Sequence, residues 1–426
     1  MKSAVLLLAV ITATRANMFN PLESISDLTK KAADAVEGLT KTIGEGSKTP
    51  IPDSLKVPRK TIPELVQAEG YPVESHYLTT QDGYILNIYR IPYGKTDKKP
   101  TKVVILQHGL LACCTDWILF GKERGLAYIL ADQGFDVWLA NCRGNYYSRN
   151  HTKLNPDKDA EFWDFSWHEI GMYDIPAMID YILKETKQEK LYHVGHSQGT
   201  TSFYVMASMK PEYNEKIIRH VSLAPVGFMN HLSSPVIQFV ALNTLPLGTL
   251  LQLMGRNEFM PEDGFLNLFT DVFCSNIGVN KAICKNVLFL MAGFNEDQIN
   301  NDDIPLIMTY YPAGAATRQI MHYGQEVNSH RFCRYDYGLM KNNKLYSGRL
   351  TPPDYELNKI TSKIYLIFSK NDWLSSDIDV ERLENALPNK VKIEAPLKNC
   401  NHLDYLFGKD APRLIYPLIT KILTEN

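Results

Sequence analysis

The sequence predicts an α/β fold with a mainly parallel central sheet and a largely helical insertion. Short apolar segments of strand length alternate with amphipathic segments of helix length from about residue 61 to residue 226. The alternation stops over residues 227–350, which are rich in Leu, Phe and Met, and resumes over residues 351–426. One sheet interrupted by an insertion is the simplest account. Two consecutive domains are the alternative, but the final segment would then have no sheet to join.

Composition limits the classes of function. The 426 residues suffice for one large domain with an insertion or for two ordinary domains. Hydrophobic residues make up 45% and charged residues 22%, as in an ordinary globular protein, and the formal net charge is -2. Nucleic acid is therefore not the expected partner, since it calls for a strongly basic face. A local basic patch stays compatible with these numbers.

The first residues have the pattern of a secretory signal. A lysine precedes an apolar run from Ala4 to Ala13, and the small residues Thr14 and Ala16 stand where a signal peptidase cuts. We predict a signal peptide over residues 1–16, too short to span a membrane. No later run reaches the roughly 18 apolar residues of a transmembrane helix. The mature protein is thus expected outside the cytosol, without a transmembrane segment.

Residues 17–60 form a predicted amphipathic helix and linker. Apolar residues recur every three or four positions over residues 22–43, after Asn20 and Pro21, which suit a helix start. Glycines and prolines between residues 44 and 52 then end the helix. A spacer or pro-segment without a lasting role and a helix that docks on lipid or a partner are both open interpretations.

Cysteines and a sequon fit a secreted chain. The seven cysteines permit up to three disulfides with one thiol left over. Metal-ligand spacing is absent from the Cys113-Cys114 pair and from the scattered Cys142, Cys333 and Cys400. Asn150, in the sequence Asn-His-Thr, is the candidate glycosylation site and predicts a surface loop.

The first part of the predicted sheet domain begins with a hairpin. Residues 75–80 and 84–90 have strand character and are separated by Gln-Asp-Gly, a hairpin turn sequence. The elements expected next are a strand at 103–106, a helix at 122–133, a strand at 135–139, a helix at 167–183 and strands at 191–194 and 220–223. After the insertion we expect a strand at 364–368, a helix at 377–387, a strand at 391–394 and a helix at 411–423.

Ser197 lies at the centre of the most informative motif. The strand at 191–194 runs into Gly-His-Ser-Gln-Gly, and a helical segment follows directly. This strand–turn–helix context is that of a nucleophile elbow. Gly195 and Gly199 lack a Cβ atom, so strand and helix can approach while the serine occupies a strained backbone conformation. A strand end with a structural serine is the alternative, and the motif alone does not decide.

A serine nucleophile needs a base, and the base needs an acid that orients it. Of the eleven histidines only His402 follows the insertion, in a loop after the strand at 391–394. Asp372 lies in the loop after the strand at 364–368 and is the preferred acid. The competing carboxylates either belong to the first turn of a helix or stand very near His402 in sequence; they are Asp377, Asp379 and Asp404.

The oxyanion formed in such chemistry needs backbone N–H donors. One is expected from Gln198, which follows the nucleophile. The other is expected from the loop after the strand at 103–106, where His108-Gly109-Leu110 points to the Leu110 amide. His108 precedes the serine and is expected to order its loop.

These motifs resemble the acid lipases, the gastric and lysosomal group of α/β-hydrolases. The resemblance extends from about residue 61 to the C-terminus and rests on residues 106–111, 143–145, 195–201, 371–372 and 401–404. It implies a Ser197–Asp372–His402 triad, oxyanion donors at Leu110 and Gln198, and a cap with a mobile lid. It also implies a Cys274–Cys284 disulfide and neither a metal nor an organic cofactor. The helix at 22–43 and the acid motif, which lacks the glycine-rich approach of vertebrate relatives, depart from the family pattern.

The expected function is hydrolysis of long-chain acyl esters, triacylglycerols or sterol esters, at an oil–water or membrane surface. An apolar lid that opens exposes a surface suited to lipid, although the same residues can pack a cap core. An esterase for soluble esters and an idle lipid-binding or storage protein are the alternatives. The expected location is extracellular, with the lysosome as the alternative. Acyl preference, pH optimum and oligomeric state do not follow from the sequence.

Overall fold

The computed structural model describes residues 59–95, 100–234, 237–238, 241, 257–259, 292–293, 295–300 and 302–425. The predicted signal peptide, the helix at 22–43, and both Cys274 and Cys284 lie outside these residues. The described chain opens with α3 (Ile62–Ala68), whose N-terminus carries a reciprocal cap. The Thr61 side chain accepts from the Glu64 amide, and the Glu64 carboxylate accepts from the Thr61 amide.

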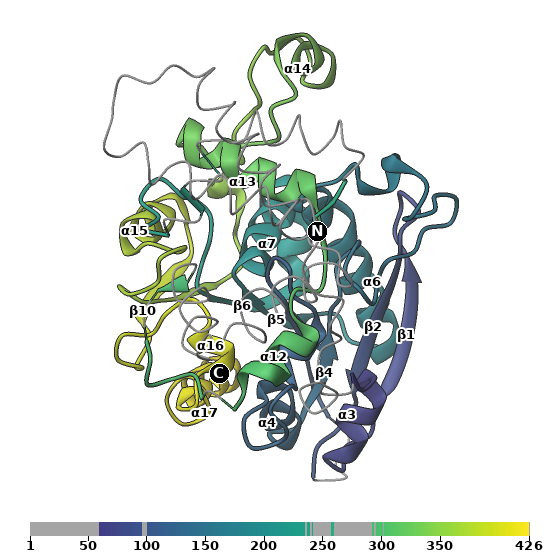
Figure 1. Cartoon of the computed structure of the whole chain (residues 1–426), viewed down its shortest axis with the longest axis vertical. Coiled ribbons are helices and arrows are strands. Elements are labelled where there is room, and N and C mark those ends of the chain that lie inside the picture. Colours follow the sequence, from purple (N-terminus) through teal and green to yellow (C-terminus); the bar gives the residue numbers. More distant parts are fainter. Residues whose placement is uncertain are drawn as a thin grey trace, which may run out of the picture.

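An eight-stranded sheet in the order β1-β2-β4-β3-β5-β6-β9-β10 forms the centre of the molecule (Figure 1). β1 and β2 form an antiparallel hairpin, β2 pairs antiparallel with β4, and every pairing from β4 to β10 is parallel. The strands are β1 (Glu74–Thr79), β2 (Ile85–Ile91), β3 (Lys102–Gln107), β4 (Phe135–Leu139), β5 (Leu191–His196), β6 (Ile217–Leu223), β9 (Ile364–Phe368) and β10 (Lys390–Glu394). The predicted mainly parallel sheet is thus confirmed.

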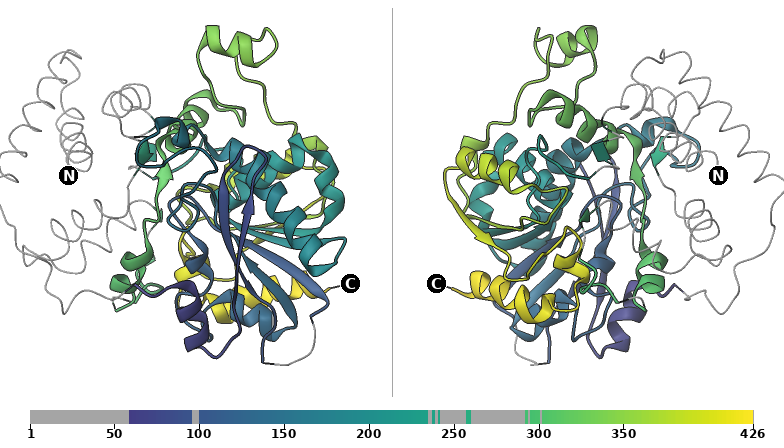
Figure 2. Two further views of the ribbon diagram at one scale, coloured as in Figure 1. Left: turned by 90° about the vertical axis from the view of Figure 1, so that its right-hand side faces the viewer. Right: turned by 60° about the vertical axis from the view of Figure 1, so that its left-hand side comes forward.

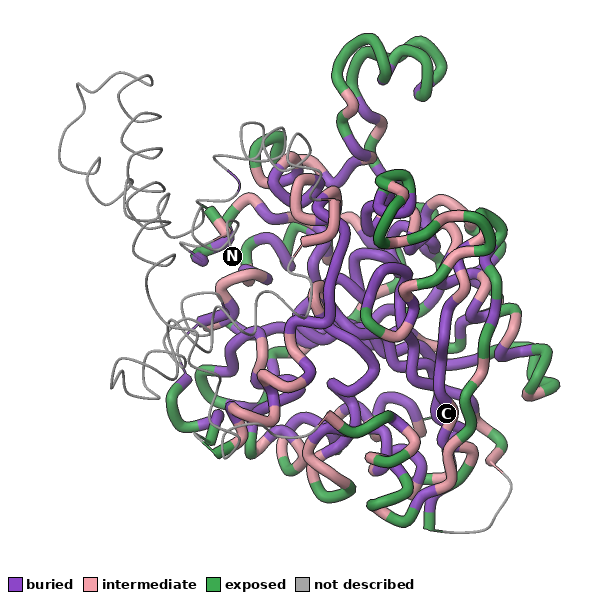
Figure 3. Tube along the Cα trace, turned by 45° about the vertical axis from the view of Figure 1, so that its right-hand side comes forward, coloured by how far each residue is buried: buried purple, intermediate pink, exposed green. Residues whose placement is uncertain are grey.

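Helices cover both faces of the sheet (Figure 2). Successive side chains along a strand point to opposite faces and therefore join different buried clusters. In β3, Val104 and Leu106 join one buried cluster, with residues of α4 (Leu126–Asp132) and α18 (Tyr416–Thr424). Val103 and Ile105 join the other, with residues of α6 (Ile175–Thr186) and α7 (Gln198–Met209). The central strands β4, β5 and β9 are buried along their whole length, and exposed residues gather at the periphery of the molecule (Figure 3). Burial on both faces explains why these strands are apolar at successive positions rather than alternating.

Three helices differ in extent from the sequence expectation. The helix expected at 122–133 begins at Leu126 because Gly125 adopts an extended conformation and caps it. The segment at 167–183 is continuous but contains a π-helical turn between α5 (Trp167–Glu169) and α6. The last helix is divided at Ile415 into α17 (Ala411–Leu414) and α18, where Pro417 near the start of α18 has no N–H to continue the ladder.

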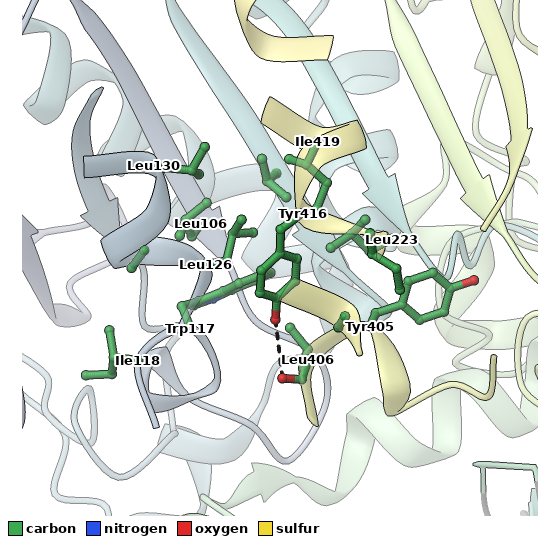
Figure 4. Close-up of a cluster of buried hydrophobic side chains, with 14 of the residues drawn as sticks. Leu106, Trp117, Ile118, Leu126, Leu130, Leu223, Tyr405, Leu406, Tyr416 and Ile419 are labelled. Atoms are coloured by element: carbon green, nitrogen blue, oxygen red, sulfur yellow. Dashed lines mark hydrogen bonds between the residues drawn. The ribbon is translucent and has the colours of Figure 1, made fainter. Parts of the chain in front are cut away.

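The C-terminal elements pack against the first part of the sheet domain (Figure 4). Tyr405 of α16 (Asp404–Phe407) and Tyr416 of α18 lie in one buried cluster with Leu106 and Trp117. The Tyr416 hydroxyl donates to the Leu406 carbonyl at 3.3 Å. This packing holds the loop before α16, which carries His402, against the strands that precede the insertion.

Helices and irregular segments share the described part of the insertion. It contains α12 (Ile304–Tyr310), α13 (Thr317–Ser329) and α14 (Leu339–Leu345), and α14 projects from the body (Figures 1 and 2). A two-residue ladder joins β7 (Glu258–Phe259) to β8 (Ala315–Ala316). After the insertion, β9 pairs in parallel with β6, and it is followed by α15 (Asp377–Ala386) and β10. The chain thus returns to the sheet that it left.

Candidate active site

Ser197 stands at the junction of β5 and α7 with φ 51° and ψ −119°. A non-glycine residue rarely adopts such a positive φ, and holding one there requires support from the surrounding structure. That support is visible on both sides of the junction. The Ser197 amide donates to the Leu223 carbonyl of β6 at 3.0 Å, and the Thr200 hydroxyl donates to the Ser197 carbonyl at 2.7 Å. The hydroxyl of Ser197 is consequently presented at the end of the sheet, half-buried.

The two flanking glycines permit the close approach of strand, helix and neighbouring loop. A Cβ atom at Gly195 would lie 2.9 Å from the Gly199 carbonyl carbon and oxygen. A Cβ atom at Gly199 would lie 2.5 Å from the Gln107 carbonyl oxygen and 2.9 Å from that of His108. Real Cβ atoms do not make such contacts with backbone, so both positions exclude every other residue without a shift of the elbow.

His402 links Ser197 to Asp372. Its Nε2 atom lies 2.8 Å from Ser197 Oγ, and its Nδ1 atom lies 2.9 Å from both carboxylate oxygens of Asp372. Both side chains are buried. Asp372 also accepts from the Leu374 and Ser375 amides, each at 2.9 Å, which holds the carboxylate in place. Because a carboxylate accepts, Nδ1 carries the proton and the Nε2 lone pair faces the serine hydroxyl.

The competing carboxylates have other partners. Asp379 binds the backbone amide and the Nδ1 atom of His231, at 2.7 and 2.8 Å. Asp377 lies in the first turn of α15, where it accepts from the Ile378 amide. Asp404 is buried and accepts from Asn401 and Asn295. The structure therefore brings Asp372 to His402, and not these three.

His108 orders the loop that carries Leu110. Its Nε2 atom accepts from the Cys142 amide at 3.1 Å, so the ring proton resides on Nδ1, which donates to the Gly109 carbonyl at 2.8 Å. Burial lowers the pKa of His108 to about 4, which keeps the ring neutral. In a trans peptide the N–H points away from the carbonyl, so the Leu110 N–H is directed opposite to His108. A Cβ atom at Gly109 would lie 3.1 Å from Ser197 Cβ, which places this loop directly against the serine.

A buried ion network fixes the neighbouring loop at residues 143–145. Arg143 binds Asp174 of the π-helical turn and Asp82 of the β1–β2 turn, with N–O distances of 2.6 to 2.9 Å. Burial raises the pKa of Asp174 despite the neighbouring guanidinium. At Asp82 burial also favours a higher pKa, but the hydrogen bonds and charge of Arg143, together with the hydrogen bond from Thr80, lower the pKa overall. Asn145 of the same loop approaches His108 Nε2 at 3.2 Å. The motif at residues 143–145 was recognisable in the sequence, but its ion-pair partners Asp174 and Asp82 were not.

Sequence reasoning missed His196. It is buried beside the serine, and its Nε2 atom donates to the His402 carbonyl at 2.8 Å. Burial lowers the pKa of this histidine to about 3, so the ring is neutral and acts as a fixed donor. The elbow pattern leaves this position free, and no sequence signal distinguishes it.

Of the remaining predicted positions, the structure describes Asn150 but neither Cys274 nor Cys284. Asn150 is exposed in a loop beside the β1–β2 hairpin, and its glycosylation stays a prediction. All five cysteines in the described ranges are buried free thiols, and Cys274 and Cys284 lie outside those ranges, so their disulfide stays a prediction. Among the residues described, no cluster of three or more His, Cys, Asp or Glu side chains is arranged to hold a metal ion. No helix in the same part of the chain is long and apolar enough to cross a membrane.

Two family models match the chain. The partial alpha/beta-hydrolase lipase region matches residues 62–121, and the alpha/beta hydrolase fold matches residues 102–256. Among solved structures, a soluble variant of monoglyceride lipase from Saccharomyces cerevisiae superimposes with a TM-score of 0.52 at 13% identity. The match covers 88% of this chain and 98% of that one and shows the shared fold.

Curated relatives are much closer in sequence. Lipase 1 of Drosophila melanogaster is 40% identical, over 85% of this chain and 79% of the relative. Gastric triacylglycerol lipase of Mus musculus is 37% identical, over 86% and 92%. Lysosomal acid lipase/cholesteryl ester hydrolase of Homo sapiens is 36% identical, over 85% and 90%. The chain therefore belongs to the acid lipase family of α/β-hydrolases and is a carboxylic ester hydrolase.

Proposed function

We propose that the protein hydrolyses long-chain acyl esters, triacylglycerols or sterol esters, with Ser197 as nucleophile, His402 as base and Asp372 as the group that orients His402. The observation that carries the proposal is the unbroken hydrogen-bonded chain from Ser197 Oγ through the His402 ring to Asp372. The tautomer that Asp372 selects leaves Nε2 free to accept the serine proton.

The proposed reaction passes through an acyl-enzyme. Ser197 Oγ attacks the ester carbonyl carbon while its proton moves to His402 Nε2. The imidazolium donates that proton to the departing alcohol oxygen as the C–O bond breaks. A water molecule then gives its proton to His402 and attacks the acyl carbon, and the fatty acid leaves as Ser197 regains its proton. The buried Asp372 carboxylate stabilises the imidazolium in both steps.

The amides of Leu110 and Gln198 are the proposed oxyanion donors. Gln198 is the first residue of α7, so its N–H has no acceptor within the helix. The Leu110 N–H points away from the Gly109 carbonyl that His108 holds. Both donors are fixed before substrate arrives, which is the condition under which such groups stabilise a transition state most.

The names of the relatives support the substrate class. A mouse relative is a gastric triacylglycerol lipase, and a human relative is a lysosomal acid lipase/cholesteryl ester hydrolase. The apolar composition of residues 227–350 suits a lid and cap over a lipid substrate. The predicted signal peptide and the exposed Asn150 are consistent with a secreted glycoprotein, with lysosomal residence as the alternative.

A paired assay of Ser197→Ala tests the mechanism. The variant should lose about 10⁴-fold or more in kcat, because the members of a triad act as a unit. Rates on emulsified long-chain triacylglycerol and on a soluble short-chain ester should fall together. If the wild type hydrolysed only the soluble ester, the protein would be assigned as an esterase and not as a lipase. If Ser197→Ala kept its activity, the proposed mechanism would be refuted.

Ser202→Ala is the matched control. Ser202 lies in α7, five residues after Ser197. It is buried, and its hydroxyl has no hydrogen-bond partner among the described residues. The same deletion of a hydroxyl should therefore leave kcat and the thermal midpoint nearly unchanged.

A further inference from the structure

A segment near the middle of the insertion, at residues 292–295, contacts both loops that carry the proposed base and acid. The Ala292 carbonyl accepts from the His402 amide at 3.1 Å and from the Trp373 amide at 3.4 Å. On the other side, the Trp373 carbonyl accepts from the Ser233 and Ser234 amides, at 2.9 and 3.2 Å, where the insertion begins. The loop after Asp372 is thus bonded to the start of the insertion and to a segment near its middle.

The fit at the next residue is tight. Gly293 has φ +107°, and a Cβ atom there would overlap the Asn371 carbonyl oxygen. Its own carbonyl accepts from Asn401 Nδ2 at 3.0 Å. The insertion therefore approaches the acid loop at van der Waals distance and simultaneously bonds to the histidine loop.

The side chain of Asn295 also connects the insertion to the loop that carries His402. Its buried amide donates to Asp404 Oδ2 at 2.7 Å, and to the Lys398 carbonyl at 3.4 Å. The same Asp404 oxygen accepts from the Asn401 amide at 2.8 Å. Asn401 Oδ1 in turn accepts from the amides of Leu403 and Asp404, at 2.9 and 3.0 Å. These bonds close the turn on either side of His402.

Asp404 is the buried titratable group at this junction. Burial raises the pKa of Asp404 to about 7, hydrogen bonds from Asn401 and Asn295 oppose this rise, and the charge of Asp372 adds to it. The other titratable groups facing it are Cys400 and Tyr405, whose pKa values burial raises well above their usual ranges, and His402 two residues away. Asp404 Oδ1 has no hydrogen-bond partner among the described residues.

We propose that Asn295 is a positioning residue for the hydrolysis proposed above. The hydrogen bond from Asn295 to Asp404 links the position of the insertion to the alignment of His402 with Ser197. A displaced insertion would shift the turn that carries His402, and a 1 Å error in such a group costs roughly a hundredfold in rate. The insertion thereby acts on turnover through the base as well as by covering the site.

Asn295→Asp converts this bond into a titratable contact. Two carboxyl groups at this distance share one proton in acid and repel each other once both ionise. With a soluble ester, we expect kcat near the wild-type value at about pH 5 and a loss of about tenfold or more at about pH 8, with KM nearly unchanged. The double variant Asn295→Asp/Asp404→Asn leaves a single carboxyl group at this contact, so the repulsion is absent and the pH-dependent part of the loss in kcat should disappear.

Gln298→Glu is the matched control on the same segment. Gln298 Nε2 donates to Asp410 Oδ2 at 3.0 Å, and its carbonyl oxygen accepts from the Asp410 amide at 3.1 Å. The change in charge and the kind of partner are the same, but Asp410 begins α17 rather than the turn at His402. The ratio of kcat to the wild-type value should stay constant with pH. Equal losses in Asn295→Asp and Gln298→Glu, or a profile of Asn295→Asp that follows the wild type, would overturn the proposal.

Crystal structures of Asn295→Asp at the two pH values separate this proposal from the proposed function. The distance between His402 Nε2 and Ser197 Oγ should increase at the higher pH while the sheet is unchanged. An unchanged distance at both pH values counts against positioning by Asn295, even if the wild type turns over esters. A change in distance supports it even if Ser197→Ala shows that another group is the nucleophile.

Discussion

At the scale of single residues, the site depends on ring nitrogens whose protons are placed by their neighbours. Asp372 selects the tautomer of His402, and the Cys142 amide selects that of His108. In each case a donor or acceptor that is far away in sequence determines which nitrogen faces the reacting groups. The chemistry of these residues therefore depends on hydrogen bonds that the motifs themselves do not contain.

Replacing His108 by Phe tests its role in holding the Leu110 amide. The ring volume is kept, but the Gly109 carbonyl loses its donor and the peptide is free to turn. We expect kcat to fall by about 10²-fold, since loss of one oxyanion donor has this effect, with little change in KM. Steady-state rates on a soluble ester measure both constants.

His76→Phe serves as the control for His108→Phe. The His76 ring lies on β1 against Trp138, with its centroid 4.7 Å from that ring, and it bonds Tyr181 and Glu74. It makes no contact with the elbow, so kcat should remain at the wild-type level. Equal effects of the two substitutions would argue against a specific role of His108.

At the scale of elements, the loop after β4 is tied to the rest of the domain by one buried cation. Arg143 bonds to the π-helical turn before α6 through Asp174 and to the β1–β2 turn through Asp82. Its guanidinium also lies over the Tyr84 ring, 4.0 Å from the centroid. Three segments that are distant in sequence meet at this side chain.

Arg143→Met should destabilise the protein by about 3–5 kcal/mol, because removal of one partner leaves the buried Asp174 charge without compensation. Urea unfolding followed by tryptophan fluorescence measures the change. Arg331→Met removes an exposed ion pair with Asp354 and should cost at most about 1 kcal/mol. If Arg143→Met lowered the free energy of unfolding no more than the control does, the buried Asp174 carboxylate would have to be neutralised by protonation or hydrated by water.

At the scale of the whole molecule, the contact between the insertion and the sheet domain contains an unpaired acid. Glu326 of α13 is buried, and neither carboxylate oxygen has a hydrogen-bond partner among the described residues. Burial raises the pKa of Glu326 well above its usual value, Asp379 of α15 adds to the rise, and Arg382 opposes it. Because the pKa of Glu326 is higher in the folded than in the unfolded protein, the free energy of unfolding is highest below the unfolded pKa. It decreases as the pH rises from there through the folded pKa.

Glu326→Gln should therefore raise the thermal midpoint at pH 7, by about 1–3 °C, and leave it unchanged at about pH 4, where the acid is protonated in both states. Thermal unfolding at a series of pH values gives the difference between variant and wild type. Glu356→Gln, at an exposed pair with Lys359, should show no such trend. A midpoint difference for Glu326→Gln that does not grow with pH would contradict the assignment.

Strands and turns could be predicted from the sequence where the pattern of neighbouring residues determines them. The strand expected at 135–139 matches β4, and that at 364–368 matches β9, because both are short runs, apolar except for Asp136, of the kind that a doubly covered sheet buries. Gly195 and Gly199 identified the turn at Ser197 because only glycine permits the approach seen there. Helix ends were less predictable. The start of α4 and the break before α18 depend on caps and a proline whose effects compete with apolar periodicity.

The sequence by itself determined the fold class, the order of serine, acid and histidine, and the family resemblance, because these depend on residue type and order along the chain. Only the tertiary structure decided which carboxylate reaches His402, what His196 and Arg143 bind, and that Asn295 meets Asp404. These contacts join segments 30 to more than 200 residues apart. Such pairings follow from how the sheet and the insertion pack together, and no local pattern encodes them.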